Sequence, residues 1–352
     1  MAWQGIEGHD EVVEQFRRAL ARGRLASSFL FVGPSGIGKR SFALALARTL
    51  LCETRPATAM DPCGQCGGCA QVDAGTHPDL IQVSKPKDKS ALPVELLIGR
   101  REHRMREGLC YDISLKPFMG GRKVAVIDDA DYLNAEGANS LLKTLEEPPP
   151  RSVLILVGTS PARQLPTIRS RCQLIRFQPL ADDVVAQLLL AGGHADDAAE
   201  ARRLAAHAEG SPERALELAE PELWTFRETF LAQLAKPSLD GLRVAKAVSQ
   251  FVDEAGREPA KRRARLRLVV GFAAEFYRAQ LRASQGFDLP QDAMLARFVE
   301  KTQARATAEP DSLVACVERC IDALEQIDRN ANQTTLIECW MDDLDQIDTT
   351  TR

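Results

Sequence analysis

A glycine-rich run at residues 33–39 has the spacing of a loop that binds phosphate groups. The pattern requires a glycine, four free positions, a second glycine and a lysine, and here these are Gly33, Gly38 and Lys39, with Gly36 between them. Backbone N–H groups of such a loop, together with the N-terminus of the next helix, cradle phosphates, and the lysine meets the terminal ones. The loop can therefore hold ATP or ADP.

The residue after the lysine departs from this pattern. Nucleotide hydrolases carry a serine or threonine there, whose hydroxyl holds Mg2+, whereas this chain has Arg40. A guanidinium repels the divalent cation that this position should bind. Ser41 is a poor substitute, because one further step along a helix turns a side chain by about 100°. The sequence predicts the fold of an ATPase with incomplete metal chemistry.

Four of the nine cysteines lie close together in the sequence. Cys63, Cys66 and Cys69 fall on two tight, glycine-opened turns, and Cys52 can supply a fourth thiolate. In a chain without a signal peptide, this spacing favours a tetrahedral Zn2+ site over disulfides. Four thiolates leave no open position, so the zinc would be structural. His77 is a weaker candidate for the fourth ligand, and reduced thiols without a metal are the alternative.

Apolar periodicity predicts the elements that position these residues. Strands are expected at residues 29–32, 79–83, 123–127 and 153–157, and helices at residues 10–22, 41–47 and 135–147. Asp10 and Asn134 are expected to cap the first and last of these helices. Alternating strands and helices predict an α/β fold, a doubly wound and mostly parallel sheet. Asp128 and Asp129 then lie at the carboxyl end of the third strand, and Thr159 follows the fourth.

Strand signals vanish beyond Pro179. The remaining sequence is rich in alanine and leucine, has amphipathic periodicity, and is interrupted near residues 210–212, 237–238, 290 and 310. We expect this region to be helical. We also expect four cysteines outside the cluster to be buried as small apolar side chains, namely Cys110, Cys316, Cys320 and Cys339.

Length and charge narrow the functional classes. The chain has 352 residues, of which 45% are hydrophobic and 27% charged, and this fits two or three globular domains. A net charge of -4 provides no general basic field for DNA, which favours protein partners. No apolar stretch approaches the roughly 18 residues of a membrane span, and residues 1–5 lack the pattern of a signal peptide. These features predict a cytoplasmic location.

Four segments, in this order, resemble one family. They are the loop with its preceding strand at residues 28–40, the cysteine module at residues 52–69, NSLLKTLEEPP at residues 139–149 and LPTIRSRC at residues 165–172. The chain resembles the bacterial replicative clamp loader subunits of the AAA+ class, and is most similar to the delta prime subunits of DNA polymerase III. This resemblance implies a RecA-like AAA+ domain at residues 1–180, a helical lid at 181–222 and a helical collar for oligomerisation at 223–352.

The resemblance implies nucleotide-site roles for three residues. Lys39 would be the phosphate lysine, with a solvated lysine at a helix start as the alternative. Asp128 would be the acid on the metal side. Asp129 stands where an active enzyme has a glutamate that polarises water, and its shorter side chain withdraws the carboxylate by about 1.5 Å, whereas misplacements near 1 Å can cost about a hundredfold in rate. A nucleotide could thus be held without being hydrolysed.

Three more residues match family positions. Arg171 resembles the arginine that reaches a neighbouring subunit's ATP, a task suited to a planar, permanent cation, and an interface salt bridge is the alternative. Arg214 resembles a lid arginine that senses nucleotide, with a structural role as the alternative. Thr159 resembles a polar sensor at a strand tip, where a strand-capping hydroxyl is the alternative.

Three functions compete at this point. The first is a non-hydrolysing clamp loader subunit that completes a ring with motor and delta-like subunits, donates Arg171 and helps to place the sliding clamp on primed DNA. The second is a motor subunit of the gamma or tau kind, which Arg40 and Asp129 disfavour. The third is a zinc-dependent nucleic-acid-binding protein, which the acidic charge balance and the 5% aromatic content disfavour. The first interpretation leads.

Overall fold

The computed structural model describes residues 3–87, 89–104, 106–119, 121–304 and 309–350. The chain forms two compact units, Met1–Ala219 and Glu220–Arg352. The boundary between the units lies close to the division expected after residue 222, and the division expected after residue 180, inside the first unit, stays a prediction. Within the described residues, no helix combines the length and apolarity needed to cross a membrane.

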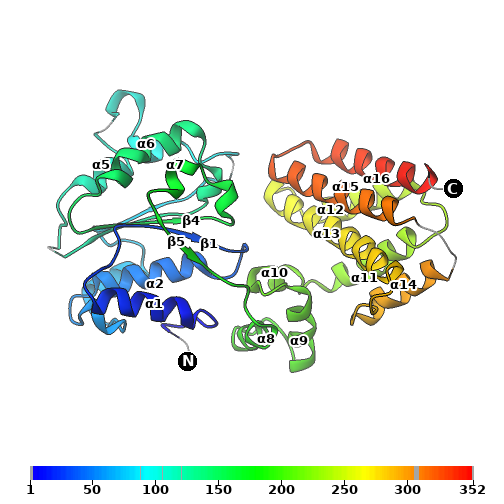
Figure 1. Cartoon of the computed structure of the whole chain (residues 1–352), viewed down its shortest axis with the longest axis horizontal. Coiled ribbons are helices and arrows are strands. Elements are labelled where there is room, and N and C mark those ends of the chain that lie inside the picture. Colours follow the sequence, from blue (N-terminus) through cyan, green and yellow to red (C-terminus); the bar gives the residue numbers. More distant parts are fainter. Residues whose placement is uncertain (1–2, 88, 105, 120, 305–308, 351–352) are drawn as a thin grey trace. The chain divides into compact units, whose positions relative to one another are not determined.

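A five-stranded parallel sheet forms the centre of the first unit (Figure 1). Its strands are β1 (Ser28–Val32), β2 (Leu80–Val83), β3 (Lys123–Ile127), β4 (Ser152–Val157) and β5 (Gln173–Arg176). The strand order is β2-β3-β4-β1-β5, and Leu30 of β1 lies opposite Leu156 on one side and Leu174 on the other. The predicted parallel sheet and its four predicted strands are confirmed. The apolar pattern does not predict β5, in which only Ile175 is buried.

Helices cover both faces of this sheet. They are α1 (Asp10–Ala21) and α2 (Lys39–Leu51) on one face, and α5 (Leu109–Ser114), α6 (Ala135–Glu146) and α7 (Pro166–Arg169) on the other, as Figure 1 shows. Successive residues of β1 alternate between the two faces. Phe29 and Phe31 pack in the core with α1 and α2, whereas Leu30 and Val32 pack in the core with α5 to α7. The sheet is therefore buried on both faces, as a parallel sheet requires.

The helix caps agree only in part with the sequence. Asn134 caps α6 as predicted, because its side-chain oxygen accepts a hydrogen bond of 2.7 Å from the Gly137 N–H. The predicted cap of the first helix is wrong, since His9 occupies the cap position and Asp10 is the first helical residue. Asp10 instead places a negative charge in the first turn, which favours the helix dipole.

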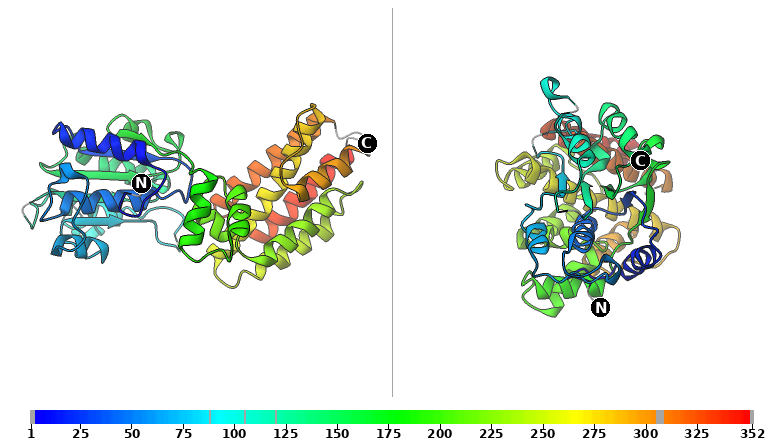
Figure 2. Two further views of the ribbon diagram at one scale, coloured as in Figure 1. Left: turned by 90° about the horizontal axis from the view of Figure 1, so that it is seen from below. Right: turned by 90° about the vertical axis from the view of Figure 1, so that its left-hand side faces the viewer.

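Shorter elements complete the first unit. Before Pro179 they are η1 (Ala57–Ala59), α3 (Gly67–Asp73), α4 (Glu95–Ile98), η2 (Arg101–His103), η3 (Ala130–Tyr132) and η4 (Pro161–Arg163). After Pro179 come α8 (Asp182–Ala191), α9 (Ala198–His207) and α10 (Pro212–Glu217). These last three helices pack on one another and are drawn in green in Figure 2.

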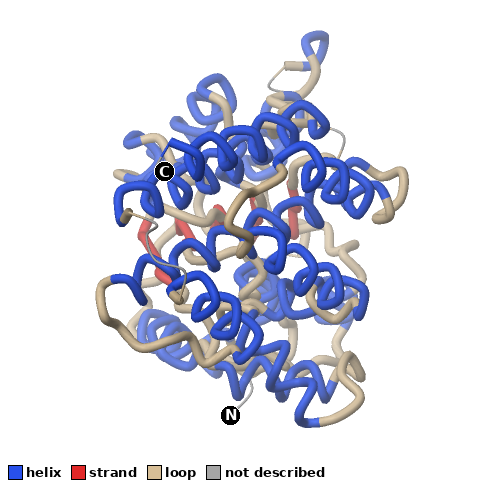
Figure 3. The backbone as a smooth tube through the Cα atoms, turned by 90° about the vertical axis from the view of Figure 1, so that its right-hand side faces the viewer, coloured by secondary structure: helices blue, strands red, loops and turns tan. Residues whose placement is uncertain are grey.

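The regular elements of the second unit, within its described residues, are all helices. Its helices are α11 (Pro221–Leu234), α12 (Gly241–Asp253), α13 (Pro259–Ser284), α14 (Ala293–Gln303), α15 (Pro310–Asp328) and α16 (Gln333–Thr350). The backbone coloured as strand in Figure 3 belongs to the first unit. Pro237 and Pro290 lie between helices and Pro310 opens α15, as expected for residues that interrupt helices.

The cysteines outside the cluster follow the expectation with one exception. Cys110, Cys316 and Cys320 are buried as predicted. The prediction for Cys339 is wrong, because this residue is exposed. Its neighbour Trp340 is fully buried and takes the inward position on α16.

Candidate functional site

The phosphate loop lies between the carboxyl end of β1 and the start of α2. Gly36 and Gly38 have positive φ angles of 73° and 92°, which residues with side chains rarely adopt. A side chain at Gly36 would also collide with α10, because its Cβ would lie 2.6 Å from the Cβ of Glu213. Buried His9 also supports the loop, since its Nε2 donates a hydrogen bond of 2.7 Å to the Ile37 carbonyl.

Lys39 folds back onto its own loop. Its side chain is buried, and Nζ donates to the carbonyl oxygens of Gly33, at 2.7 Å, and of Pro34. Burial lowers the pKa of Lys39, and the nearby carboxylates of Asp131, Asp128 and Glu213 oppose this effect. The lysine is thus held at the base of the loop, next to the position where the motif places phosphates.

Arg40 pairs with the acid at the end of β3. Its Nε lies 3.5 Å from Oδ2 of Asp128, and its side chain is 55% exposed. This ion pair joins the two sequence positions that hold Mg2+ in active phosphate-loop enzymes. The sequence predicted that Arg40 would oppose a metal ion, and the geometry adds that Arg40 occupies the side of Asp128 that faces α2.

Asp129 has an unusual backbone conformation and a half-buried side chain. Its φ angle is 56°, and its carboxylate accepts a hydrogen bond of 3.3 Å from the Lys85 N–H. Burial and the neighbouring charge of Asp128 raise the pKa of Asp129. The carboxylate is therefore tied to backbone on the β2 side, in addition to being shorter than a glutamate.

Asp131 is a member of the site that sequence reasoning missed. One of its carboxylate oxygens accepts from the backbone N–H of Thr159, at 2.8 Å, and from its hydroxyl, at 2.5 Å. The other oxygen accepts from the side-chain amide of Gln164 at 2.6 Å. The Thr159 hydroxyl, the predicted sensor, is thus directed to Asp131. Only the position of Asp131 three residues after Asp128 could have drawn attention to it.

These residues line one cavity of about 470 Å³, called here the loop cavity. It brings together six predicted residues, namely Gly36, Gly38, Lys39, Asp128, Asp129 and Thr159. It also includes Arg40, Asp131, Arg163 and Glu213. Arg214 is not among the described residues that line it, because its guanidinium pairs with Glu209 at 3.0 Å while the preceding Glu213 faces the loop. The predicted sensing role of Arg214 stays a prediction.

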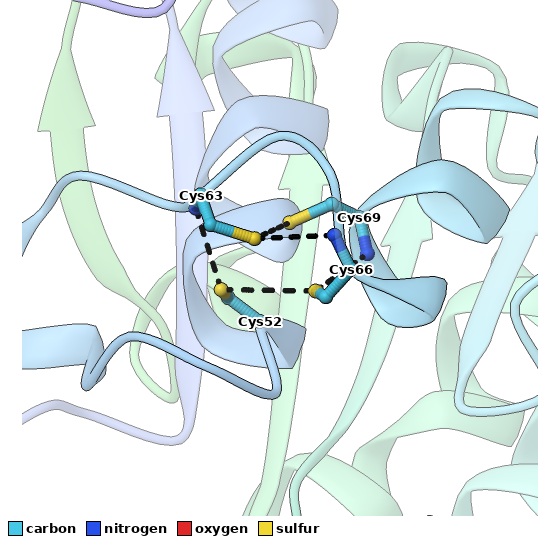
Figure 4. Close-up of side chains that lie close together, drawn as sticks. All are labelled: Cys52, Cys63, Cys66 and Cys69. Atoms are coloured by element: carbon cyan, nitrogen blue, oxygen red, sulfur yellow. Dashed lines mark hydrogen bonds between the residues drawn. The ribbon is translucent and has the colours of Figure 1, made fainter.

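The four predicted cysteines converge on one point (Figure 4). Their sulfur atoms all lie within 4.8 Å of one another, with 3.9 Å between Cys52 and Cys66 and between Cys63 and Cys69. A tetrahedral ion with metal–sulfur bonds of about 2.3 Å needs sulfur atoms roughly 3.8 Å apart, so the cluster fits such an ion. His77 lies outside this group, and its Nδ1 accepts from the Asp79 N–H at 3.0 Å.

Backbone donors prepare two of the thiols to lose their protons. Burial acts to raise the pKa of Cys52, but N–H groups of Cys63 and Arg55 outweigh it and lower the value to about 7. The Thr54 hydroxyl and two backbone N–H groups lower the pKa of Cys63 to about 6. Burial raises the pKa of Cys69 to about 12. A bound cation would favour the thiolate form of all four.

Arg171 lies outside the loop cavity, just after α7. Its Nε donates to Glu146 at 2.8 Å, its Nη2 also contacts this carboxylate, and its Nη1 donates to the Thr167 carbonyl at 3.0 Å. The side chain is 30% exposed, so the fork is held within the chain rather than free in solvent. Glu146, the last residue of α6, is a partner that sequence reasoning missed.

The chain is similar to bacterial replication proteins over its N-terminal half. Residues 8–181 match the family described as "DNA polymerase III, delta subunit". DNA polymerase III subunit delta' of Pseudomonas aeruginosa is 38% identical over 54% of this chain and 55% of that protein, and its Escherichia coli counterpart is 36% identical over 60% of each. Subunit tau of Escherichia coli is 33% identical over 51% of this chain and 25% of that protein. The matches therefore span little more than half the length of the delta' relatives.

The cysteine geometry leads to a prediction about metal content. Protein purified without chelators should contain about one metal ion per chain, and replacing Cys63 and Cys66 together by serine should remove it. The melting temperature should fall by roughly 10 °C, because a closed site contributes several kcal/mol and each kcal/mol corresponds to about 2–4 °C in a domain of this size. Elemental analysis and thermal unfolding followed by circular dichroism measure the two effects.

Exposed Cys339→Ser is the matched control and should change neither quantity. Metal-free protein, or a double variant that melts at the wild-type temperature, would contradict the assignment.

Proposed function

Because residues 8–181 match the family described as "DNA polymerase III, delta subunit", and the chain is 36–38% identical to two delta' subunits over 54–60% of its length, we propose that it is a delta'-like subunit of the replicative clamp loader. In this role it completes a ring with motor and delta-like subunits and helps to place the sliding clamp on primed DNA. The partners, the clamp and the DNA are parts of the proposal, as is the cytoplasmic location that follows from them. The helical second unit would serve as the oligomerisation collar.

The ion pair between Arg40 and Asp128 is the observation that favours a scaffold over a motor. A motor subunit needs a hydroxyl and an acid on Mg2+, and a base that positions water. Here the first position is a guanidinium 3.5 Å from the second, and the Asp129 carboxylate accepts from the Lys85 backbone. Arg40 and Asp129 both replace residues that act in the hydrolysis step, whereas the glycines and the lysine that bind phosphate are retained.

The second candidate is a motor subunit of the gamma or tau kind. It is favoured by the 33% identity to subunit tau and by a loop cavity that has the lysine and the acids of an ATPase. The two candidates differ in a measurable property, since only the motor hydrolyses ATP by itself.

Arg171 is the residue proposed to act on a neighbouring ATP. It is an arginine on the surface of the first unit, and its planar fork is suited to the charge that develops on a transferring phosphoryl group. Glu146 holds this fork at 2.8 Å in the isolated chain. In the assembled ring, the neighbour's phosphates would replace Glu146 as the partner of Arg171.

The metal in the cysteine cluster is proposed to be zinc. Four thiolates in a tetrahedral arrangement are typical of structural Zn2+, and soft sulfur ligands disfavour Mg2+ and Ca2+. Cys52 follows the end of α2, and Cys69 lies in α3, so the ion would join the helix that starts at the phosphate loop to the segment that follows it. Its contribution would be to stability and not to bond making.

We expect no ATP hydrolysis by the isolated chain above background, even with Mg2+ and primed DNA, because Arg40 replaces the metal-binding hydroxyl. Steady-state phosphate release measures this rate, and Lys39→Ala defines the background. A multiple-turnover rate that disappears in Lys39→Ala would favour the motor candidate.

We expect Arg171→Ala to preserve folding and ring formation and to slow hydrolysis at the adjacent motor site. Arginine fingers contribute on the order of a thousandfold or more where they are the main charge donor. Lys substitution should rescue little, because an ammonium lacks the planar fork. The measurement is single-turnover hydrolysis in reconstituted complexes in which only the site facing this chain is intact.

Exposed Arg169→Ala, two residues earlier, is the matched control and should leave the rate unchanged. An unchanged rate in Arg171→Ala would instead mean that this arginine is structural.

A further inference from the structure

The Arg40 side chain places a positive charge near the position where related loops bind a metal cation. In phosphate-loop enzymes, the residue after the lysine and the acid at the end of the second motif strand hold Mg2+ between them. The corresponding residues here are Arg40 and Asp128, which form an ion pair with 3.5 Å between Nε and Oδ2. The positive charge of the guanidinium therefore lies next to Asp128, the acid that would otherwise bind the metal ion.

The residues of the loop cavity do not fit Mg2+. This ion requires nearly octahedral oxygen ligands at about 2.0–2.1 Å, and a guanidinium offers only N–H donors. Among the described residues, the only group of three or more His, Cys, Asp or Glu side chains close enough to share an ion is the cysteine cluster. Asp128, Asp129 and Asp131 do not converge, because each carboxylate has a different partner, as described above.

The features that bind phosphate are nevertheless retained. The loop has its three glycines with positive φ, it opens the 13-residue helix α2, and Lys39 lies at its base. Arg40 contacts Asp128 through Nε, and its side chain is 55% exposed, so the two Nη groups are the remaining donors of a fork that lines the cavity. Guanidinium groups form strong, charge-assisted hydrogen bonds with phosphate oxygens.

We propose that Arg40 takes the place of Mg2+ in this loop, so that the site binds the phosphates of a nucleoside di- or triphosphate without a divalent cation. The inference rests on the proposal that the loop is a nucleotide site, and it is independent of the role of Arg171. It differs from simple loss of the metal, because it assigns the missing positive charge to a residue of the chain.

Glu213 sets the strength of this binding. The cavity is lined by four acidic residues, Asp128, Asp129, Asp131 and Glu213, and by three basic ones, Lys39, Arg40 and Arg163. Arg40 neutralises Asp128, and Thr159 and Gln164 donate to Asp131. Glu213 faces Gly36, the middle glycine of the loop, where it repels an incoming phosphate. Removing its charge should therefore strengthen binding.

The test is equilibrium binding of fluorescent ADP and ATP analogues to the full chain, in excess EDTA and in excess Mg2+. The wild-type affinity should be the same within about twofold in the two buffers. Arg40→Ser, which restores the usual hydroxyl, should weaken binding in EDTA by about ten- to hundredfold, the value of a hydrogen bond to a charged group, and should recover affinity when Mg2+ is added. Arg40→Lys, which keeps the charge, should bind in EDTA within a few-fold of wild type.

Controls tie the signal to the loop. Lys39→Ala should abolish binding, and Glu213→Gln should tighten it several-fold in EDTA. Arg18→Ser, at an exposed position of α1, should have no effect. Thermal unfolding of every variant checks that the loop is still folded. Three results would overturn the inference: wild-type binding that requires Mg2+, no binding in either buffer, or Arg40→Ser binding as tightly as wild type in EDTA. None of these outcomes depends on ring assembly, so they are separate from a failure of the clamp loader proposal.

Discussion

The parallel pairing of β1 between β4 and β5 is the constraint on which the site depends. Because all five strands run in one direction, their carboxyl ends meet at one edge of the sheet. The phosphate loop, Asp128 and Thr159 follow β1, β3 and β4 respectively. The direction of the strands alone therefore brings them to this edge of the sheet. The alternating apolar residues of β1 hold the strand between two cores, and this packing determines where the loop begins.

Several charged side chains at this edge of the sheet are paired with groups of the chain. Lys39 is buried, and burying its charge without partners would cost free energy. Two loop carbonyls and three nearby carboxylates stabilise this charge. Asp128 is paired with Arg40, and Asp131 with Thr159 and Gln164. Asp129 accepts from the Lys85 N–H. The three aspartates of the site thus each have a different partner from the chain itself, in contrast to a metal site, where several acids share one ion.

Much of this arrangement could be predicted from the sequence, and the remainder could not for a physical reason. The buried strands β1, β3 and β4, the Asn134 cap and the four cysteines have strong local signals, since their residue types and spacing suffice. β5 is an edge strand with only Ile175 buried, so its pairing with β1 depends on tertiary structure. Asp131, Glu146 and Glu213 interact with residues distant in sequence, and no local pattern identifies such partners.

The two surface arginines of the proposed mechanism illustrate how similar ion pairs can have different consequences. Arg171 is held by Glu146 at the protein surface, where such pairs contribute only about 0–1 kcal/mol. In the proposed ring, a triphosphate on a neighbouring subunit would offer more charge than one carboxylate, so it would displace Glu146 at little cost. Arg40 and Asp128 sit instead at the wall of a cavity whose other cations are Lys39 and Arg163. Separating them would leave Asp128 facing any bound phosphate, and under the proposal this repulsion would keep Arg40 in place when a nucleotide binds. In the proposed mechanism, the same type of ion pair would thus allow Arg171 to change partners and would keep Arg40 next to Asp128.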